Sequence, residues 1–169
     1  MISGFNAATI YGYGNILELL TTTNVKTINY RYYKFLPTLL RSTGSNSVQF
    51  SELSLRNSGV RVNYTNAVAT NPGGSNPGGE TPNYAIDNNV NTKFLDFNKG
   101  PLVIDFTRNT LITEYTFATA NDGSDRDPIS WQFYGSNDNS TWVLLDTQTN
   151  YATTQARYTY QNYFTITPV

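Results

Sequence analysis

The sequence predicts an all-β fold, and three observations lead to it. Of its 169 residues, 24 are Thr, 13 are Tyr and 9 are Phe, and these residue types favour strands. Another 21 are Asn and 12 are Gly, which favour turns. Short segments rich in aromatic and β-branched residues recur, with turn signals roughly every 8 to 12 residues. This spacing is typical of a β-sandwich.

Charge and residue types exclude several classes of function. The chain has no Cys and no His, which excludes disulfides, thiolate chemistry and His-based zinc sites and leaves only metal sites built from hard oxygen ligands. With 11 basic and 12 acidic residues the net charge is -1, so we expect no nucleic-acid partner. No apolar run approaches the roughly 18 residues of a spanning helix, so we expect no membrane insertion.

Residues 1–28 are predicted to form an N-terminal arm, and residues 29–169 the β-sandwich. The segment NILELL (15–20) can make a short amphipathic helix capped by Asn15, before TTTN breaks it. The first residues lack the basic start and long apolar stretch of a secretory signal. We therefore expect a soluble chain that does not leave the cell by that route. Its surface composition is nevertheless typical of an extracellular or virion protein, and release by cell lysis would reconcile the two.

Strands are expected from Lys26 onward. KTINYRYYKFLPTLLR (26–41) is rich in aromatic residues, and Pro37 predicts an edge or a bulge in its later part. SVQFSELSL (47–55) alternates apolar and polar residues, with an irregularity expected near Ser51 and Glu52. NSG (57–59) predicts a turn, and VRVNYTNAV (60–68) predicts a further strand.

Two copies of Asn-Pro-Gly-Gly follow, at residues 71–74 and 76–79. This composition fits a linker at a domain boundary or a long loop crossing the end of a sandwich. We favour the loop, because each flanking half is too small to be a closed sheet. Beyond it, Trp131 and Trp142 lie on predicted strands and are expected to be core or half-buried. The segments expected to form strands there are KFLDF, GPLVIDF, TLITEYTFATA, ISWQFYGS, TWVLLDTQ and ARYTYQNYFTITPV.

Three segments resemble elements of a known family. AIDNNVNTKF (85–94) resembles the A-x-D-G-[DN]-x-x-T-x-W element of discoidin-like domains, also called coagulation factor 5/8 type C or galactose-binding-like domains. Asn88 replaces its Gly, which is a mild departure because Asn tolerates a left-handed turn, and Phe94 replaces its Trp. ISWQFYGSNDNSTWVLLD (129–146) and VQFSELSL (48–55) resemble two further elements. The resemblance implies a jelly-roll β-sandwich.

The order of these elements departs from the family. The strands that RYYKF and VQFSELSL resemble close the domain in the family, whereas here they stand at the front. The resemblance therefore implies a circular permutation, or else residues 26–56 complete the sandwich of a neighbouring subunit. We favour the intramolecular arrangement. In either case a buried strand slot has to be filled, because an open central edge invites aggregation.

The resemblance also implies a structural calcium ion at the Asn-rich loop. Asp87 would supply a carboxylate, Asn89 a carbonyl, and Thr92 its hydroxyl or carbonyl, while Glu52 would close the cage. Calcium suits such a set because it takes six to eight oxygen ligands in flexible geometry. The alternative stays open, since Asp and Asn runs make Asx-turns without any metal and Glu52 can simply pair with an arginine.

Sugar binding needs an aromatic face for the C–H side of a ring and planar polar groups for its hydroxyls. Candidates on predicted loops are Tyr84, Asn121, Arg126 and Tyr151. Asn121 and Arg126 belong to the polar loop ANDGSDRDP (120–128). That loop is either structural or in contact with a ligand. Most Tyr and Phe residues of a β-protein instead pack its sheets.

The sequence favours a non-enzymatic protein. No His or Cys exists to build the usual triads, and no two acids mark a glycoside-hydrolase pair. NPGGSNPGG lacks the Gly-Lys-Ser/Thr ending of a phosphate loop.

Two functions of different class remain. Similar combinations of elements occur in tail, fibre and collar proteins of bacteriophages and large viruses. The resemblance therefore implies a virion structural or accessory protein that forms a homo-oligomer and contacts other virion proteins. The alternative is a carbohydrate-binding adhesin that recognises host glycans, on a virion or at a cell surface. The apolar N-terminal arm favours assembly over adhesion.

Overall fold

The computed structural model describes residues 29–166, which form an all-β fold with two short 3-10 helices. The predicted N-terminal arm and its short helix at residues 15–20 lie outside these residues. No helix within 29–166 is long and apolar enough to cross a membrane. The strands are β1 (Asn29–Leu40), β2 (Val48–Phe50), β3 (Glu52–Asn57), β4 (Val60–Arg61), β5 (Val68–Thr70), β6 (Phe94–Asp96), β7 (Leu102–Leu111), β8 (Glu114–Ala118), β9 (Pro128–Ser136), β10 (Val143–Gln148) and β11 (Phe164–Thr165), and the 3-10 helices are η1 (Pro82–Ala85) and η2 (Ser124–Arg126).

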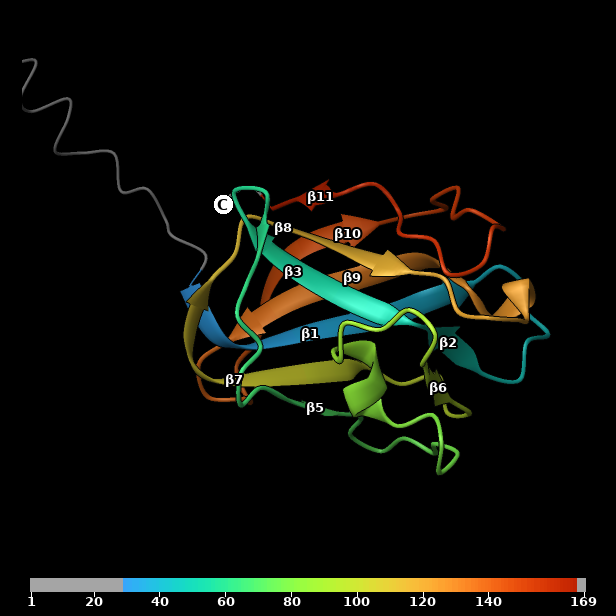
Figure 1. The fold of residues 1–169 in the computed structure, drawn as a ribbon, viewed down its shortest axis with the longest axis horizontal. Helices are drawn as coiled ribbons and strands as arrows, with labels where there is room; N and C mark the ends of the chain where they lie inside the picture. The colour runs from blue at the N-terminus through green and yellow to red at the C-terminus, as the bar shows by residue number, and fades with distance from the viewer. Residues whose placement is uncertain (1–28, 167–169) are drawn as a thin grey trace, which may run out of the picture.

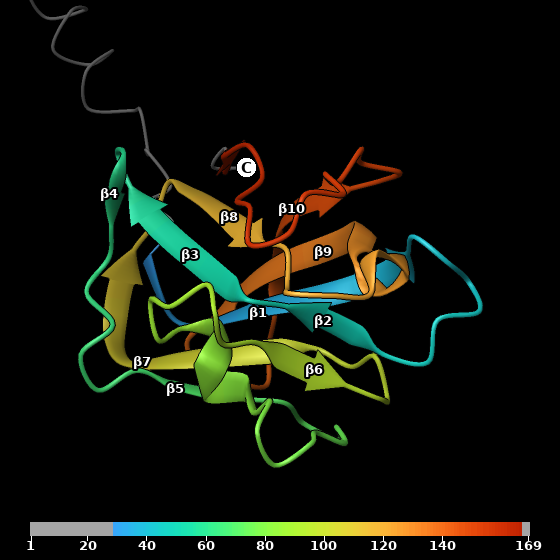
Figure 2. The same ribbon diagram turned by 45° about the vertical axis from the view of Figure 1, so that its right-hand side comes forward.

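The strands form two main layers. A five-stranded sheet has the order β10-β9-β1-β7-β5, and a four-stranded sheet has the order β11-β8-β3-β4. In Figure 1 the strands β3 and β8 lie in front of the β9 and β1 side of the larger sheet, as two packed layers do. A two-stranded sheet of β2 and β6 extends one end of the sandwich (Figure 2). Every pairing is antiparallel, and the predicted all-β sandwich is confirmed.

The front segments fill the sandwich of their own chain. Strand β1 lies at the centre of the larger sheet, where Tyr33 pairs with Ile104 on one side and with Gly135 on the other. Strand β3 pairs with β8, Leu53 opposite Phe117. The intramolecular arrangement favoured from the sequence is therefore what the structure has.

Two predicted irregularities are also confirmed. The register between β1 and β9 shifts between Pro37 and Leu39, and pairing with β7 ends at Phe35. Ser51 separates β2 from β3. Proline forces the first break because it has no N–H to give to the ladder.

The prediction of one strand over residues 60–68 is wrong, because only its ends form strands β4 and β5. Between them the Tyr64 hydroxyl donates to the carbonyl of Leu53 at 3.0 Å and accepts the N–H of Leu55 at 2.8 Å. These bonds draw the chain onto the edge of β3. A guanidinium nitrogen of Arg108 also bonds the carbonyl of Asn63 at 2.7 Å, which fixes the bend.

The Asn-Pro-Gly-Gly stretch is fastened to the sandwich by a buried carboxylate. Asp96 at the end of β6 accepts the N–H groups of Ser75 at 2.7 Å, Asn98 at 3.1 Å and Gly100 at 2.6 Å. At Gly74 an added Cβ would lie 1.3 Å from the side-chain oxygen of Asn71, so a larger residue would displace that side chain from its bond to the Pro101 carbonyl. The stretch is therefore a folded loop of the sandwich.

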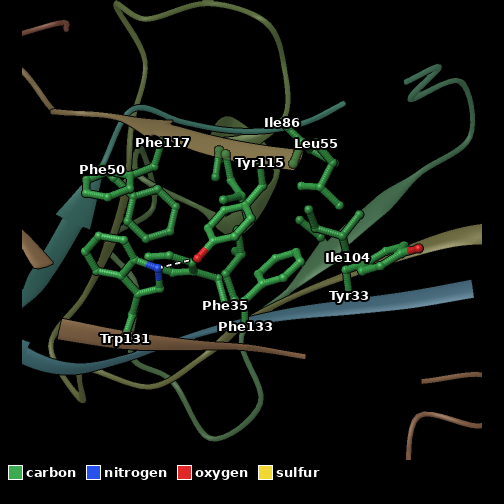
Figure 3. Close-up of a cluster of buried hydrophobic side chains, with 14 of the residues drawn as sticks. Tyr33, Phe35, Phe50, Leu55, Ile86, Ile104, Tyr115, Phe117, Trp131 and Phe133 are labelled. Atoms are coloured by element: carbon green, nitrogen blue, oxygen red, sulfur yellow. Dashed lines mark hydrogen bonds between the residues drawn. The ribbon is translucent and has the colours of Figure 1, made fainter. Parts of the chain in front are cut away.

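Aromatic side chains from both layers make the core (Figure 3). Trp131 is fully buried, and its indole nitrogen donates to the Tyr115 hydroxyl at 2.7 Å. The Tyr115 ring stacks on Phe133 with centroids 4.2 Å apart. Trp131 is thus a core residue on β9 and Trp142 is half-buried, as expected, although Trp142 lies just before β10 (Val143–Gln148) rather than on a strand.

Candidate functional site

The outer face of strand β3 is unusually well covered. Leu53 and Leu55 point into the core, so Glu52, Ser54 and Arg56 point away from it, because side chains alternate along a strand. Glu52 is nevertheless 0% exposed and Ser54 is 3% exposed. Two segments provide the cover. The loop of residues 86–92 bonds Glu52, and the segment of residues 158–163 bonds strand β8.

The Asn-rich loop is closed on itself. The Asp87 carboxylate accepts the N–H of Asn89 at 2.9 Å, an Asx-turn. The Thr92 hydroxyl lies 2.7 Å from both the other Asp87 oxygen and the Asn89 carbonyl oxygen. Asn88 has φ 65°, the left-handed conformation expected where the family pattern has glycine.

Glu52 joins this loop from strand β3. Its Oε1 accepts the Asn89 N–H at 3.1 Å, and its Oε2 lies 3.4 Å from a guanidinium nitrogen of Arg61. Burial is the main cause that raises the pKa of Glu52 to about 7, and the neighbouring Asp87 carboxyl is the second. The positive charge of Arg61 acts in the opposite direction. The structure thus brings together the four residues proposed as calcium ligands, although Glu52 lies on a distant segment.

The residues fit a calcium ion by their chemistry. Within residues 29–166 no three acidic residues converge, so a cation here would have two carboxylates, from Asp87 and Glu52. The remaining ligands would be neutral oxygens such as those of Asn89 and Thr92, which calcium accepts. A buried carboxylate beside a second one is a group that a divalent cation stabilises. The Asx-turn and the Arg61 contact close the same loop without a metal, so both interpretations of the sequence stand.

A pocket opens next to this loop, over the outer face of the four-stranded sheet. Its volume is about 210 Å³. Tyr160 and Tyr163 at its rim are 40% and 53% exposed. Of the described residues that line it, the charged ones are both arginines. The lining comprises Ser54, Arg56, Arg61, Asn88, Thr116, Tyr160 and Tyr163.

The β3–β4 hairpin sets the positions of the two arginines. Ser58 and Gly59 have φ of 48° and 84°, as a two-residue type I′ turn requires at both central positions. Counting outward from this turn, Arg56 lies directly opposite Arg61. The Arg56 guanidinium lies 4.6 Å from the ring centroid of Tyr163, and its Nε lies 3.5 Å from a carboxylate oxygen of Glu114.

A larger hollow of about 300 Å³ lies at the far end of β1. No aromatic side chain is among the described residues that line it, so it offers no face on which a sugar ring can pack. Its lining comprises Pro37, Thr38, Leu39, Leu40, Ser42, Thr43 and Lys99.

Comparison with known proteins bears on the fold and on this site. The F5/8 type C domain family matches residues 65–169, more than half of the chain. The chain belongs to this family. Searches of curated proteins and of solved structures each gave no match. Members of the F5/8 type C family often bind carbohydrates or other ligands. The matched region begins after β4, yet β1 and β3 pair inside the same F5/8 type C sandwich, as the displaced order of its elements predicts.

The tyrosines predicted to contact a glycan lie apart from the pocket. Tyr151 packs on the core of the F5/8 type C domain, with ring centroids 5.5 Å from Trp131 and 5.0 Å from Phe164. Tyr84 lies in η1 and is half-buried. Neither residue lines either of the two hollows described above.

The two polar candidates, Asn121 and Arg126, share the loop of residues 120–128. Arg126 lies 3.9 Å from Asp122, which is itself bonded by Lys93 at 2.9 Å, so this charge network is structural. Asn121 is exposed. Neither lines the two hollows, and glycan contact by these four residues stays a prediction.

The pocket residues Arg56, Arg61, Tyr160 and Tyr163 were not predicted from the sequence. One signal was available for the arginines, because the predicted NSG turn places Arg56 opposite Arg61 by simple counting. No local signal places the tyrosines. The C-terminal segment reaches the pocket because the Gln161 N–H bonds the Phe117 carbonyl at 2.9 Å.

Proposed function

We propose that this F5/8 type C domain is a non-enzymatic module that binds carbohydrate in the pocket beside the Asn-rich loop. The observation that carries the proposal is the pairing of two exposed rings, Tyr160 and Tyr163, with buried polar side chains in one hollow. The rings offer a face to the C–H side of a sugar, and the polar groups fix its hydroxyls. At about 210 Å³ the hollow is smaller than the roughly 300–1,000 Å³ of drug-sized sites, which suits a single sugar residue.

The polar groups at the floor of the pocket have capacity left for a ligand. The Thr116 hydroxyl donates to the Gln161 carbonyl at 3.0 Å, which leaves its oxygen free to accept a bond from a sugar hydroxyl. Ser54 lies beside it on strand β3, and both side chains are held by the sheet. Asn88 contributes an amide, which has both donors and an acceptor, from the rim.

A structural calcium ion at Asp87, Asn89, Thr92 and Glu52 is part of the same proposal. The ion would supply positive charge to two neighbouring carboxylates, one of them fully buried. Because Asn88 belongs to the loop that these residues close, they also position the rim of the pocket. This support comes from the donor set and from the resemblance of the loop to the family pattern.

The role in a virion remains a separate proposal. It rests on the composition of the chain and on the apolar residues 1–28, which lie outside the described residues. A side chain such as Val60, 70% exposed at the tip of the β3–β4 hairpin, is compatible with a contact to another virion protein or to a second copy. Location on a virion or at a cell surface suits a glycan-binding module equally well.

The test is binding of the full chain to a glycan array, followed by titration of each hit. Tyr163→Ala should weaken binding at least tenfold, since stacking on an exposed ring would be lost. Tyr158→Ala is the matched control, because Tyr158 is 45% exposed on the same segment but does not line the pocket. Absence of any glycan ligand, or equal binding by Tyr163→Ala and Tyr158→Ala, would refute the proposal. Ring formation on a sizing column without glycan binding would favour the assembly role.

A further inference from the structure

Two positive charges face one another across the β3–β4 hairpin. Arg56 and Arg61 are direct partners in the ladder, a placement that is unfavourable for like charges. Each has a carboxylate behind it. Glu114 lies 3.5 Å from Arg56, and Glu52 lies 3.4 Å from Arg61. Neither acid lines the pocket, so the charges presented to a ligand are both positive.

Both guanidinium groups also keep a donor that the described residues leave unused. The Nε atoms of Arg56 and Arg61 are buried, and neither makes a hydrogen bond within residues 29–166, although the Arg56 Nε lies 3.5 Å from the Glu114 carboxylate. A buried donor without a partner is unfavourable, and native proteins satisfy such groups with protein, water or ligand atoms. The arginines therefore have unmet hydrogen-bonding capacity in a pocket whose charged lining residues are both arginines.

The guanidinium groups are held in place before any ligand arrives. Arg61 lies 4.0 Å from the ring centroid of Tyr64, and it bonds the carbonyl of Ile86 at 3.2 Å. Arg56 lies over the ring of Tyr163. Groups fixed in this way lose little conformational entropy when a ligand binds, so the site is preorganised for an anion.

We infer that the pocket selects sugars that carry a carboxylate, and that Arg56 and Arg61 recognise this group. The inference rests on the proposed function, because it assigns a ligand class to the same pocket. A guanidinium matches a carboxylate with two parallel N–H···O bonds. The tyrosines and hydroxyl groups described above bind the remainder of the sugar.

Charge favours a carboxylate over a phosphate. A phosphate monoester carries nearly two negative charges at neutral pH, whereas a sugar carboxylate carries one. The two arginines are already opposed by Glu52 and Glu114, which lie behind them. A monoanion therefore gains from the arginines with less repulsion from these acids, and the exposed tyrosine rings suit a pyranose better than a bare phosphate.

Calorimetric titration of the full chain tests the inference. The probes are N-acetylneuraminate and its methyl ester, in which one added methyl group removes the charge, together with galacturonate and galactose. We expect each acid to bind at least tenfold more tightly than its neutral counterpart, with the preference shrinking as salt is added. Equal binding of acid and ester would overturn the inference while leaving the proposed function intact. Binding of sulfated sugars alone would have the same two consequences. Absence of binding to every sugar would instead overturn the proposed function.

Variants locate the recognition. Arg56→Gln should abolish the preference for the acid and retain weak binding of the neutral sugar. Arg31→Gln is the matched control, because Arg31 also lies over a tyrosine ring, at 4.8 Å, and pairs with a carboxylate, Asp105, at 2.8 Å on the other sheet. Arg56→Lys keeps the charge without the fork and should give an intermediate preference, and it keeps the test available if Arg56→Gln fails to fold. An unchanged preference in both Arg56 variants would refute the assignment.

Discussion

The buried hydroxyl of Tyr115 should contribute more to stability than its size suggests. It accepts the indole N–H of Trp131 at 2.7 Å and donates to the Asp146 carboxylate at 2.7 Å. Burial, with the charge of Asp146 adding to it, raises the pKa of Tyr115 well above its usual range, so the hydroxyl keeps its proton and can donate. Tyr115→Phe removes both bonds and leaves the fully buried indole N–H without an acceptor. A buried unsatisfied donor costs about 1–3 kcal/mol and a bond to a charged group about 1.5–3 kcal/mol, so we expect a loss of roughly 2–4 kcal/mol.

Urea unfolding followed by circular dichroism measures this loss as a change of midpoint at constant slope. Tyr134→Phe is the control, because the Tyr134 hydroxyl also donates to a side chain, Gln132 at 2.6 Å, but is half-exposed. Water can replace that bond, so the control should change stability by less than about 0.5 kcal/mol. If Tyr115→Phe behaves like the control, the Trp131–Tyr115–Asp146 chain does not stabilise the core and the reasoning fails.

Three further predictions concern the loops. Millimolar calcium should raise the melting temperature of the full chain relative to a sample with chelator. The stabilisation should be equivalent to about 2.7 kcal/mol at a hundredfold excess of calcium over Kd, and Asp87→Asn should remove it. Equal melting temperatures in calcium and chelator would contradict a structural ion. Backbone N–H groups of Thr141 and Ser140 lower the pKa of Asp138 to about 2. The ionised Asp138 carboxylate therefore stabilises the fold above its ordinary pKa of 3.8, and this contribution is lost as the pH falls through about 2. Asp138→Asn should flatten the dependence of unfolding free energy on pH in this range, and an unchanged dependence would count against these bonds. Gly59→Ala should lower the free energy of unfolding in urea by roughly 1–2 kcal/mol, because φ at Gly59 is 84°. Gly78→Ala is the control and should be near neutral, because an added Cβ there meets open space. Equal effects of the two substitutions would argue against the type I′ turn.

Much of the sandwich follows from local patterns. In ISWQFYGS every second side chain is apolar or absent, which predicts a strand with one buried face, and Trp131 and Phe133 are indeed fully buried on β9. Pro37 predicts its own bulge because it lacks a donor. The approach of Glu52 to Asp87 followed from resemblance to the family pattern, since nothing in either segment alone indicates the other. These features are set by residues that act within a few positions or by sequence elements that a family shares.

The pocket could not be predicted in the same way. Residues 60–68 have the composition of a strand, but the Tyr64 hydroxyl bonds the backbone of Leu53 and Leu55 and so replaces strand pairing with a bend. The segment that carries Tyr160 and Tyr163 makes only one isolated bridge, Tyr160 with Ala118, and its position depends on single bonds to β8. Such contacts are chosen by the packing of the whole domain and leave no period in the sequence. The four glycan candidates were selected as loop residues, yet loop position alone does not bring side chains together.

Arg61 connects the Asn-rich loop to the pocket. A single nitrogen of its guanidinium contacts both Glu52, at 3.4 Å, and the carbonyl of Ile86, at 3.2 Å, where the Asn-rich loop begins. Its Nε has no partner among the described residues, and its side chain lines the pocket. Removing Arg61 would therefore leave a buried carboxylate without its arginine partner while also removing a proposed ligand contact, so loss of binding in such a variant would combine both effects. Arg56 has no bond to that loop among those described, and Glu114 opposite it is partly exposed. The proposed specificity of the pocket is consequently best measured at Arg56, while Arg61 links Glu52 directly to the proposed sugar site.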